Sequence, residues 1–144
     1  MFLVSNMMQI TFKIIGNPHA KGRPRFSRAG AFVKTYTDAE TKAYEELVAF
    51  SAKRAMGSSK PLKTALEAYL YFSIPIPKSY SKKRTEACLS GLERPIRKDL
   101  DNLCKSVMDG MNKIVYEDDG QIVDLHSTKV YGEPFVEVLI KETQ

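Results

Sequence analysis

The stretch Asp99-Leu-Asp-Asn-Leu-Cys-Lys-Ser-Val-Met-Asp-Gly-Met111 carries the clearest structural signal in this chain. A helix turns by about 100° per residue, so one face of a helix over this stretch gathers its apolar side chains, which are Leu100, Leu103, Cys104, Val107, Met108 and Met111. The same helix places Asp101, Lys105 and Asp109 four residues apart along one polar edge. The pattern predicts a helix that packs on a core and presents carboxylates and an ammonium group together.

The sequence on either side of this helix predicts an α+β fold. Alternating apolar residues from Met8 to Ile15 indicate a half-buried strand, and further strands are expected at 66–74, 122–130 and 134–141, with Tyr131 and Gly132 as a hairpin between the last two. Helices are expected from Thr37 to about Ala55, begun by a Thr37–Glu40 capping box, and over 79–89. We expect residues 19–36 to form a long loop with a short hairpin around Gly30. The prediction is one compact domain, 1–144, with a mixed β-sheet of about four strands and helices packed on it.

Length and composition narrow the class of protein. A chain of 144 residues with 43% apolar content suffices for one ordinary core. Its apolar runs fall far short of the roughly 20 residues that a membrane span needs, and its N-terminus lacks the basic leading region and cleavage site of a secretion signal. We therefore expect a cytoplasmic protein without a membrane partner. Cys88 and Cys104 lack the spacing of zinc or redox motifs, so both are expected to be reduced and structural.

Basic residues gather in two segments that flank an acidic one. The net charge is +5, and the residues up to Tyr36 include no acid. A polyanionic partner suits this pattern, because each neutralised phosphate adds to binding. The candidate DNA contacts of the first segment are Lys21, Arg23, Arg25, Arg28 and Lys34. Those of the second segment, which leads directly into Asp99, are Lys82, Lys83, Arg84, Arg94, Arg97 and Lys98.

The acidic centre, 99–124, has two interpretations. Carboxylates at this density repel one another, and Mg²⁺ would relieve the conflict because it prefers carboxylate, water and phosphate oxygens. A calcium loop fits less well, because Asp99-Leu-Asp-Asn-Leu departs from the EF-hand pattern. In the alternative interpretation the acids lie on a solvated helix face, Glu117–Gly120 is a polar turn, and Lys105 is an intrahelical partner of Asp101 or Asp109. The residues alone leave both interpretations open.

The acidic centre resembles a known signature. The run Asp99–Asp109, followed by Glu117-Asp-Asp-Gly-Gln-Ile122, is similar to the RusA family of Holliday junction resolvases, and so are Lys21–Phe26, Pro77–Lys83 and the length. The resemblance implies a homodimeric, Mg²⁺-dependent endodeoxyribonuclease that resolves four-way DNA junctions by paired nicks in recombination and repair, with Mn²⁺ as a substitute metal. Whether its origin is a bacterium or a resident prophage stays open. It also implies that Asp99, Asp101 and Asp119 bind metal, with Asp118 as the alternative to Asp119. Lys105 would be the essential lysine, and Asp109 would have a supporting role such as packing or helix capping.

Chemistry of this kind needs no covalent nucleophile. One or two Mg²⁺ ions would acidify a water, polarise the phosphate and orient an in-line attack, while Lys105 would neutralise the developing charge or orient the water. Two rival hypotheses remain. One is a non-catalytic DNA-binding accessory protein with structural acids, and the other is a general metal-dependent nuclease or phosphohydrolase acting on RNA or nucleotides. The two basic segments exceed what a small nucleotide would require.

Overall fold

The centre of the fold is a four-stranded mixed sheet with the strand order β1-β6-β4-β5. The computed structural model describes residues 7–22, 25–29, 32–36 and 38–143. Its strands are β1 (Gln9–Ile15), β2 (Arg25–Ala29), β3 (Phe32–Tyr36), β4 (Leu66–Ile74), β5 (Ile122–Tyr131) and β6 (Phe135–Glu142). Its helices are α1 (Ala39–Met56), α2 (Lys82–Leu89), α3 (Leu100–Met111) and the short 3-10 helix η1 (Asp119–Gln121). The predicted α+β class with a mixed sheet of four strands is confirmed.

Strand alternation decides which side of the sheet faces the core. In β1, Ile10, Phe12 and Ile14 are buried, whereas Thr11 and Lys13 between them are exposed. Strand β1 pairs antiparallel with β6, β6 pairs antiparallel with β4, and β4 pairs parallel with β5. The inner strands follow the same alternation, β4 from Leu66 to Phe72 and β6 from Phe135 to Ile140, so their apolar side chains continue the buried layer that β1 begins.

The predicted hairpin between the last two strands is wrong, because β4 lies between β5 and β6 in the sheet. The turn after Tyr131 reverses the chain as expected, but it steps over the end of β4. There the Gly132 N–H donates to the Ile74 carbonyl (2.9 Å), and a Cβ at Gly132 would lie 2.8 Å from the Ser73 hydroxyl. A local turn pattern specifies a reversal, but it does not specify whether a distant strand inserts between the two arms.

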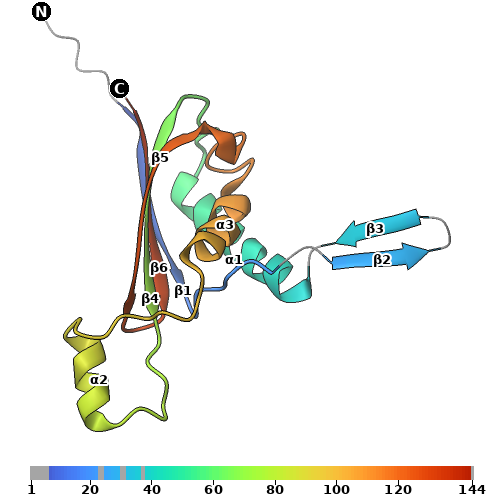
Figure 1. Cartoon of the computed structure of the whole chain (residues 1–144). Coiled ribbons are helices and arrows are strands. Elements are labelled where there is room, and N and C mark those ends of the chain that lie inside the picture. Colours follow the sequence, from blue (N-terminus) through green and yellow to red (C-terminus); the bar gives the residue numbers. More distant parts are fainter. Residues whose placement is uncertain (1–6, 23–24, 30–31, 37, 144) are drawn as a thin grey trace, which may run out of the picture.

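Helices α1 and α3 cover one face of the sheet (Figure 1). The apolar face predicted for α3 is confirmed, because Leu103, Val107 and Met111 are fully buried. The two helices approach closely at Gly110, where a Cβ would lie only 2.6 Å from Val48 Cβ and 3.0 Å from the Glu45 carbonyl oxygen. This contact requires glycine because no side chain fits between the helices.

Helix α1 begins one residue later than its expected cap. Thr37, half of the predicted capping box, lies outside the described residues. The described N-cap is Asp38, whose carboxylate accepts a hydrogen bond from the Thr41 N–H (2.8 Å), so a short side-chain acceptor starts the helix.

None of the described helices is long and apolar enough to cross a membrane. Both cysteines are free and buried.

Two elements extend away from the sheet (Figure 1). One is the antiparallel β2–β3 hairpin, which forms within the segment expected to be a loop with a hairpin. The other is α2, whose N-cap is Ser81 with its hydroxyl accepting from the Arg84 N–H (3.2 Å). These two extensions carry most of the basic residues that sequence analysis selected.

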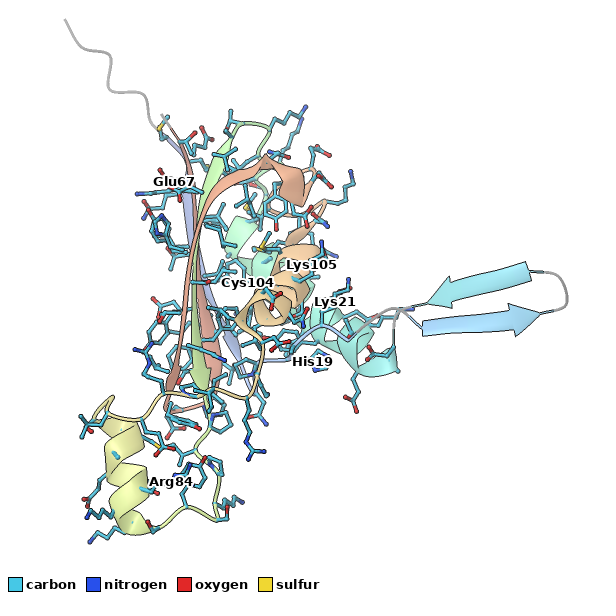
Figure 2. The ribbon with its side chains drawn as sticks, viewed as in Figure 1. His19, Lys21, Glu67, Arg84, Cys104 and Lys105 are labelled. Carbon is cyan, nitrogen blue, oxygen red and sulfur yellow. The ribbon has the colours of Figure 1, made fainter. Side chains whose placement is uncertain are left out.

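The sheet face opposite α1 and α3 is not covered by any described helix (Figure 1). Figure 2 shows Glu67 on that side, away from Lys21 and Lys105. The face carries an aromatic surface, in which Tyr71 stacks on Phe135 and remains 40% exposed.

The Gly110 contact gives a test of the packing. Gly110→Ala should lower the free energy of unfolding by about 1–3 kcal/mol, because the added methyl group overpacks the α1–α3 contact. Glycine to alanine inside a helix ordinarily stabilises by roughly 1 kcal/mol, so the expected sign is reversed. Urea unfolding followed by circular dichroism measures the change. The control Lys42→Ala, on the exposed side of α1, should stay within about 0.5 kcal/mol, and a Gly110→Ala variant more stable than wild type would contradict the contact.

Candidate active site

The first acidic group lies at the N-terminal end of α3. Asp99 is the N-cap residue, but its carboxylate makes no capping hydrogen bond and instead accepts from the Asn102 side-chain amide (3.3 Å). Asp101 lies in the first turn, and its carboxylate accepts from the Asn102 N–H (3.0 Å). Both aspartates are exposed. The partial positive charge of the helix N-terminus favours carboxylates here, and their lone pairs remain accessible from solution.

The second acidic group lies on the turn that contains η1. The Asp118 carboxylate turns back to accept from the Gly120 N–H (2.8 Å), whereas the Asp119 carboxylate points toward α3. The Asp119 N–H donates to the side-chain oxygen of Asn112, the C-cap residue of α3 (3.0 Å). This bond fixes the acidic turn against the end of the helix.

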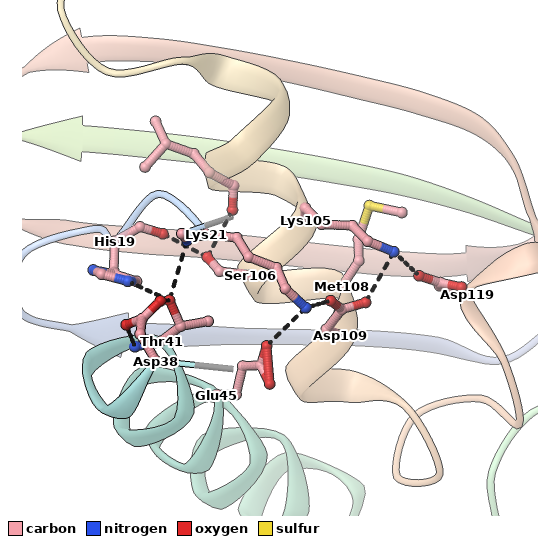
Figure 3. A network of polar contacts seen from close by, with 12 residues as sticks. His19, Lys21, Asp38, Thr41, Glu45, Lys105, Ser106, Met108, Asp109 and Asp119 are labelled. Atoms are coloured by element: carbon pink, nitrogen blue, oxygen red, sulfur yellow. Dashed lines mark hydrogen bonds and ion pairs between the residues drawn. The ribbon is translucent and has the colours of Figure 1, made fainter. Parts of the chain in front are cut away.

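Lys105 joins the two elements. Its ammonium group lies 3.2 Å from Asp119 Oδ2 and 3.1 Å from Asp109 Oδ1 (Figure 3). The hydrogen bond that Lys105 donates to Asp109 is the largest of the effects that raise the Lys105 pKa above its ordinary value, and Asp119 adds to it. Lys105 therefore stays charged near neutral pH. The predicted intrahelical partner Asp109 and the acid of the distant turn both contact it.

Lys21 occupies the other side of Asp109. Its ammonium group forms an ion pair with Asp109 Oδ2 and lies 3.5 Å from Glu45 Oε2 (Figure 3). Burial alone would lower the Lys21 pKa, but the two carboxylates outweigh burial and raise it. Burial likewise opposes ionisation of Asp109, and the two lysines outweigh it and lower the Asp109 pKa. Lys21 was expected to contact DNA, but its ammonium group is paired with carboxylates of the protein.

The Lys21 backbone is also fixed to α3. Its N–H donates to the Asn102 carbonyl (2.9 Å), and the neighbouring His19 carbonyl accepts from the Ser106 hydroxyl (2.5 Å). The Gly22 N–H donates to the Thr41 hydroxyl of α1 (3.1 Å). The segment Pro18–Gly22, which we call the strap, is therefore tied to both helices.

The carboxylates of Asp99, Asp101 and Asp119 are suitable ligands for a hard divalent cation, although they do not converge on one point. Carboxylate oxygens are the protein ligands that Mg²⁺ prefers, and Mg²⁺ commonly takes one or two of them together with phosphate and water. Within the described residues, no three acidic, histidine or cysteine side chains converge as a metal cage. Asp99 and Asp101 share the head of α3, while Asp119 is held by Lys105 on the neighbouring turn.

Some of the predicted DNA-binding residues are exposed, whereas others are already bound to groups of the protein. Lys82, Lys83 and Arg97 are exposed. Arg84, at the foot of the molecule in Figure 2, pairs with Glu93 (2.7 Å) and lies over the Tyr80 ring. Arg94 donates to the Lys129 carbonyl and the Thr128 hydroxyl, and Lys98 donates to the Pro18 carbonyl (2.8 Å). Burial lowers the Lys98 pKa. Arg23 lies outside the described residues, as do the side chains of Arg25, Arg28 and Lys34.

Three uncharged residues that sequence analysis did not select hold the acidic turn in place. The Gln121 side chain accepts from the N–H groups of Glu117 and Asp118 (2.9 and 3.0 Å) and donates to the Leu62 and Thr64 carbonyls. The buried Tyr116 hydroxyl donates to the Met108 carbonyl of α3 (2.6 Å). Asn112 is the third. The spacing of Asp118 and Gln121, three residues apart, is that of a capping box and was a usable signal for Gln121.

A small mixed-sheet domain that gathers acids and a lysine at one helix, with basic segments beside them, has the features of a nucleic-acid hydrolase. Residues 16–141 match the family model described as Endodeoxyribonuclease RusA, so the chain belongs to the RusA endodeoxyribonuclease family. It is also similar to the protein named "Uncharacterized protein YqaN" of Bacillus subtilis (strain 168), at 39% identity over 140 residues, which cover 92% of this chain and 96% of that relative. The resemblance expected from the acidic signature is confirmed. Family membership supports an endodeoxyribonuclease with a Holliday junction resolvase role.

The lowered Asp109 pKa predicts a pH-dependent contribution to stability. A carboxyl group with a depressed pKa in the folded state stabilises the fold above its ordinary pKa, and that contribution is lost as the pH falls through the folded-state value. Asp109→Asn should therefore lower the free energy of unfolding by about 1–3 kcal/mol at pH 7, because it removes the charged partner of the partly buried Lys21. The difference from wild type should shrink by pH 3.

Urea unfolding at both pH values measures this difference, with the exposed α1 substitution Glu46→Gln as the control. An Asp109→Asn penalty that is equal at pH 7 and pH 3 would contradict the ion-pair account.

Proposed function

We propose that this chain is a divalent-metal-dependent endonuclease that resolves four-way DNA junctions by paired nicks in recombination and repair, acting on DNA in the cytoplasm. The observation that carries this proposal is the Lys105 ammonium group held between the carboxylates of Asp109 and Asp119, on the helix whose N-terminal end carries the exposed Asp99 and Asp101. Membership in the RusA family supplies the reaction class.

Asp99, Asp101 and Asp119 would hold the metal, with Mg²⁺ the first choice and Mn²⁺ a substitute. The orientation of the Asp118 carboxylate toward its own turn favours Asp119 over Asp118 as the third ligand. A bound ion of this kind acidifies water and stabilises charge on a phosphate. Lys105 places a compact positive charge beside Asp119, where it would neutralise charge on the phosphate oxygens or orient the attacking water.

The DNA would follow the two basic segments. Lys82, Lys83 and Arg97 are exposed and suited to phosphate contacts, whereas Arg84 and Lys98 would first have to exchange their present protein partners. Arg23, Arg25, Arg28 and Lys34 of the hairpin remain predicted contacts. The number of basic residues in the two segments exceeds what a nucleotide substrate needs. It therefore favours a polynucleotide substrate over the small substrates of the general phosphohydrolase alternative.

A homodimer would present two equivalent sites to a branched substrate. We propose that it forms through the uncovered sheet face. The lysines of that face are already paired with acids, Lys13 with Glu137 (3.9 Å) and Lys141 with Glu67 (3.4 Å), while His126 Nε2 lies 2.9 Å from Asp124 Oδ1. A balanced face attracts DNA poorly, while its aromatic surface suits an equivalent face of a second copy.

Cleavage of a synthetic four-way junction tests the proposed reaction. Wild type should make paired nicks in the junction with Mg²⁺ or Mn²⁺ and none in EDTA. Asp101→Asn should lower the rate at least 100-fold while it retains binding, because removal of one ligand charge weakens the metal site without touching the basic segments. Glu46→Gln, on the exposed side of α1, should cleave like wild type.

Matched linear duplex and RNA substrates separate the rivals. Binding without cleavage under every metal condition would favour the accessory-protein hypothesis. Equal cleavage of linear duplex or RNA would favour a general nuclease.

The dimer face has its own test. Tyr71→Glu should raise the dimer dissociation constant at least tenfold, because it would bury a carboxylate without a partner at the centre of the proposed interface. Sedimentation velocity over a concentration series measures this constant. Phe50→Glu is the control, because Phe50 is 59% exposed on α1 and lies outside that face. A wild-type monomer at all concentrations, or a dimer that tolerates Tyr71→Glu, would contradict the assignment.

A further inference from the structure

Asp109 lies at the centre of a row of alternating charges. The row runs through Glu45, Lys21, Asp109, Lys105 and Asp119, which come from α1, the strap, α3 and the acidic turn (Figure 3). Exposure rises along it from Asp109, whose side chain is 14% exposed, to Lys105, whose side chain is 52% exposed. The row thus joins a partly buried ion pair to the surface where substrate would bind.

The two oxygens of the Asp109 carboxylate have different partners. Oδ2 pairs with Lys21, and Oδ1 pairs with Lys105 at 3.1 Å. Both oxygens of the carboxylate are therefore paired, and the two lysine ammonium groups fix the orientation of its plane. A carboxylate bound in this way is a rigid acceptor for Lys105, so the lysine side chain has already lost much of its rotamer freedom before a phosphate arrives.

We propose that Asp109 is a positioning residue that holds Lys105 for phosphodiester cleavage, and that Lys21 acts with it by neutralising the Asp109 charge. This inference rests on the proposed function and extends it to two residues outside the metal-binding acids. Lys105 acts on the phosphate only when its ammonium group is correctly placed, because a displacement of about 1 Å can cost 100-fold in rate. Lys21 allows Asp109 to fix Lys105 without leaving an unbalanced negative charge beside the phosphate.

Lys21 is poorly placed to contact DNA itself. Its side chain is 21% exposed, its ammonium group is paired with two carboxylates, and its N–H is bound to the Asn102 carbonyl. A residue that only binds phosphate would change affinity and its salt dependence. A residue that acts through Lys105 would change the rate at saturation.

The experiment measures single-turnover junction cleavage with saturating enzyme and Mg²⁺, and junction affinity in EDTA. Asp109→Asn should lower the saturated rate at least tenfold, and Lys21→Met at least threefold, each with the dissociation constant within twofold of wild type. Lys21→Arg, which keeps the charge, should recover most of the lost rate. The matched control Lys42→Met removes an exposed charge from α1, outside both basic segments, so it should change neither the saturated rate nor the junction affinity.

A double-mutant cycle separates positioning from general structural damage. In a Lys105→Met background, Asp109→Asn should change the remaining rate by less than twofold, because there is no ammonium group left to hold. Circular dichroism at the assay temperature establishes that each variant is folded, and Lys21→Met carries the test if Asp109→Asn does not fold.

Three outcomes overturn the inference. Equal rate losses from Asp109→Asn in both backgrounds would show a structural role, and weaker binding at an unchanged saturated rate would show a DNA contact. A wild-type protein that cleaves no junction with Mg²⁺ or Mn²⁺ would remove the proposed function and this inference with it. That last outcome is recognised by the inactivity of the wild type itself.

Discussion

The close approach of α3 to α1 at Gly110 is the constraint on which the site depends. Because Gly110 lies against Val48 and the Glu45 carbonyl, α3 cannot rotate about its axis without a clash. Its apolar face stays on the core, and Lys105 and Asp109 must then face the strap and the acidic turn. Glu45 belongs both to this packing contact and to the row of charges, so the helix contact and the electrostatic arrangement are parts of one structural solution.

Local patterns were enough to predict the elements that carry the site. The apolar residues recur at regular intervals over 100–111 and 66–74, and these patterns predicted the bounds of α3 and β4. The structure has both elements at those residues. The order of strands was not predictable in the same way. The insertion of β4 between β5 and β6 is a pairing between residues far apart in the sequence, and the turn at Gly132 contains no information about it.

In the candidate site, too, local contacts were predictable from the sequence and long-range contacts were not. The relation between Lys105 and Asp109 follows from their spacing on one helix, and the acidic turn was visible as a run of charge. The partnership between Lys21 and Asp109 spans 88 positions, so the basic composition around Lys21 suggested DNA instead. Composition reports which charges a segment carries, whereas the fold decides which of them remain available to a partner from outside.

Availability also distinguishes the aspartates from one another. Asp109 and Asp119 are paired with lysines, whereas Asp99 and Asp101 form no ion pair within the described part of the chain and accept hydrogen bonds only from Asn102 there. The helix N-terminus offers them about 0.3–1 kcal/mol of favourable interaction, which is less than two adjacent carboxylates need to bring a phosphate beside them. A divalent cation changes the sign of this local field, because its two charges attract the carboxylates and the phosphate together. Under the proposed function, Asp99 and Asp101 at the head of α3 would receive a divalent cation, while Lys105, already held by Asp109 and Asp119, supplies a second positive charge.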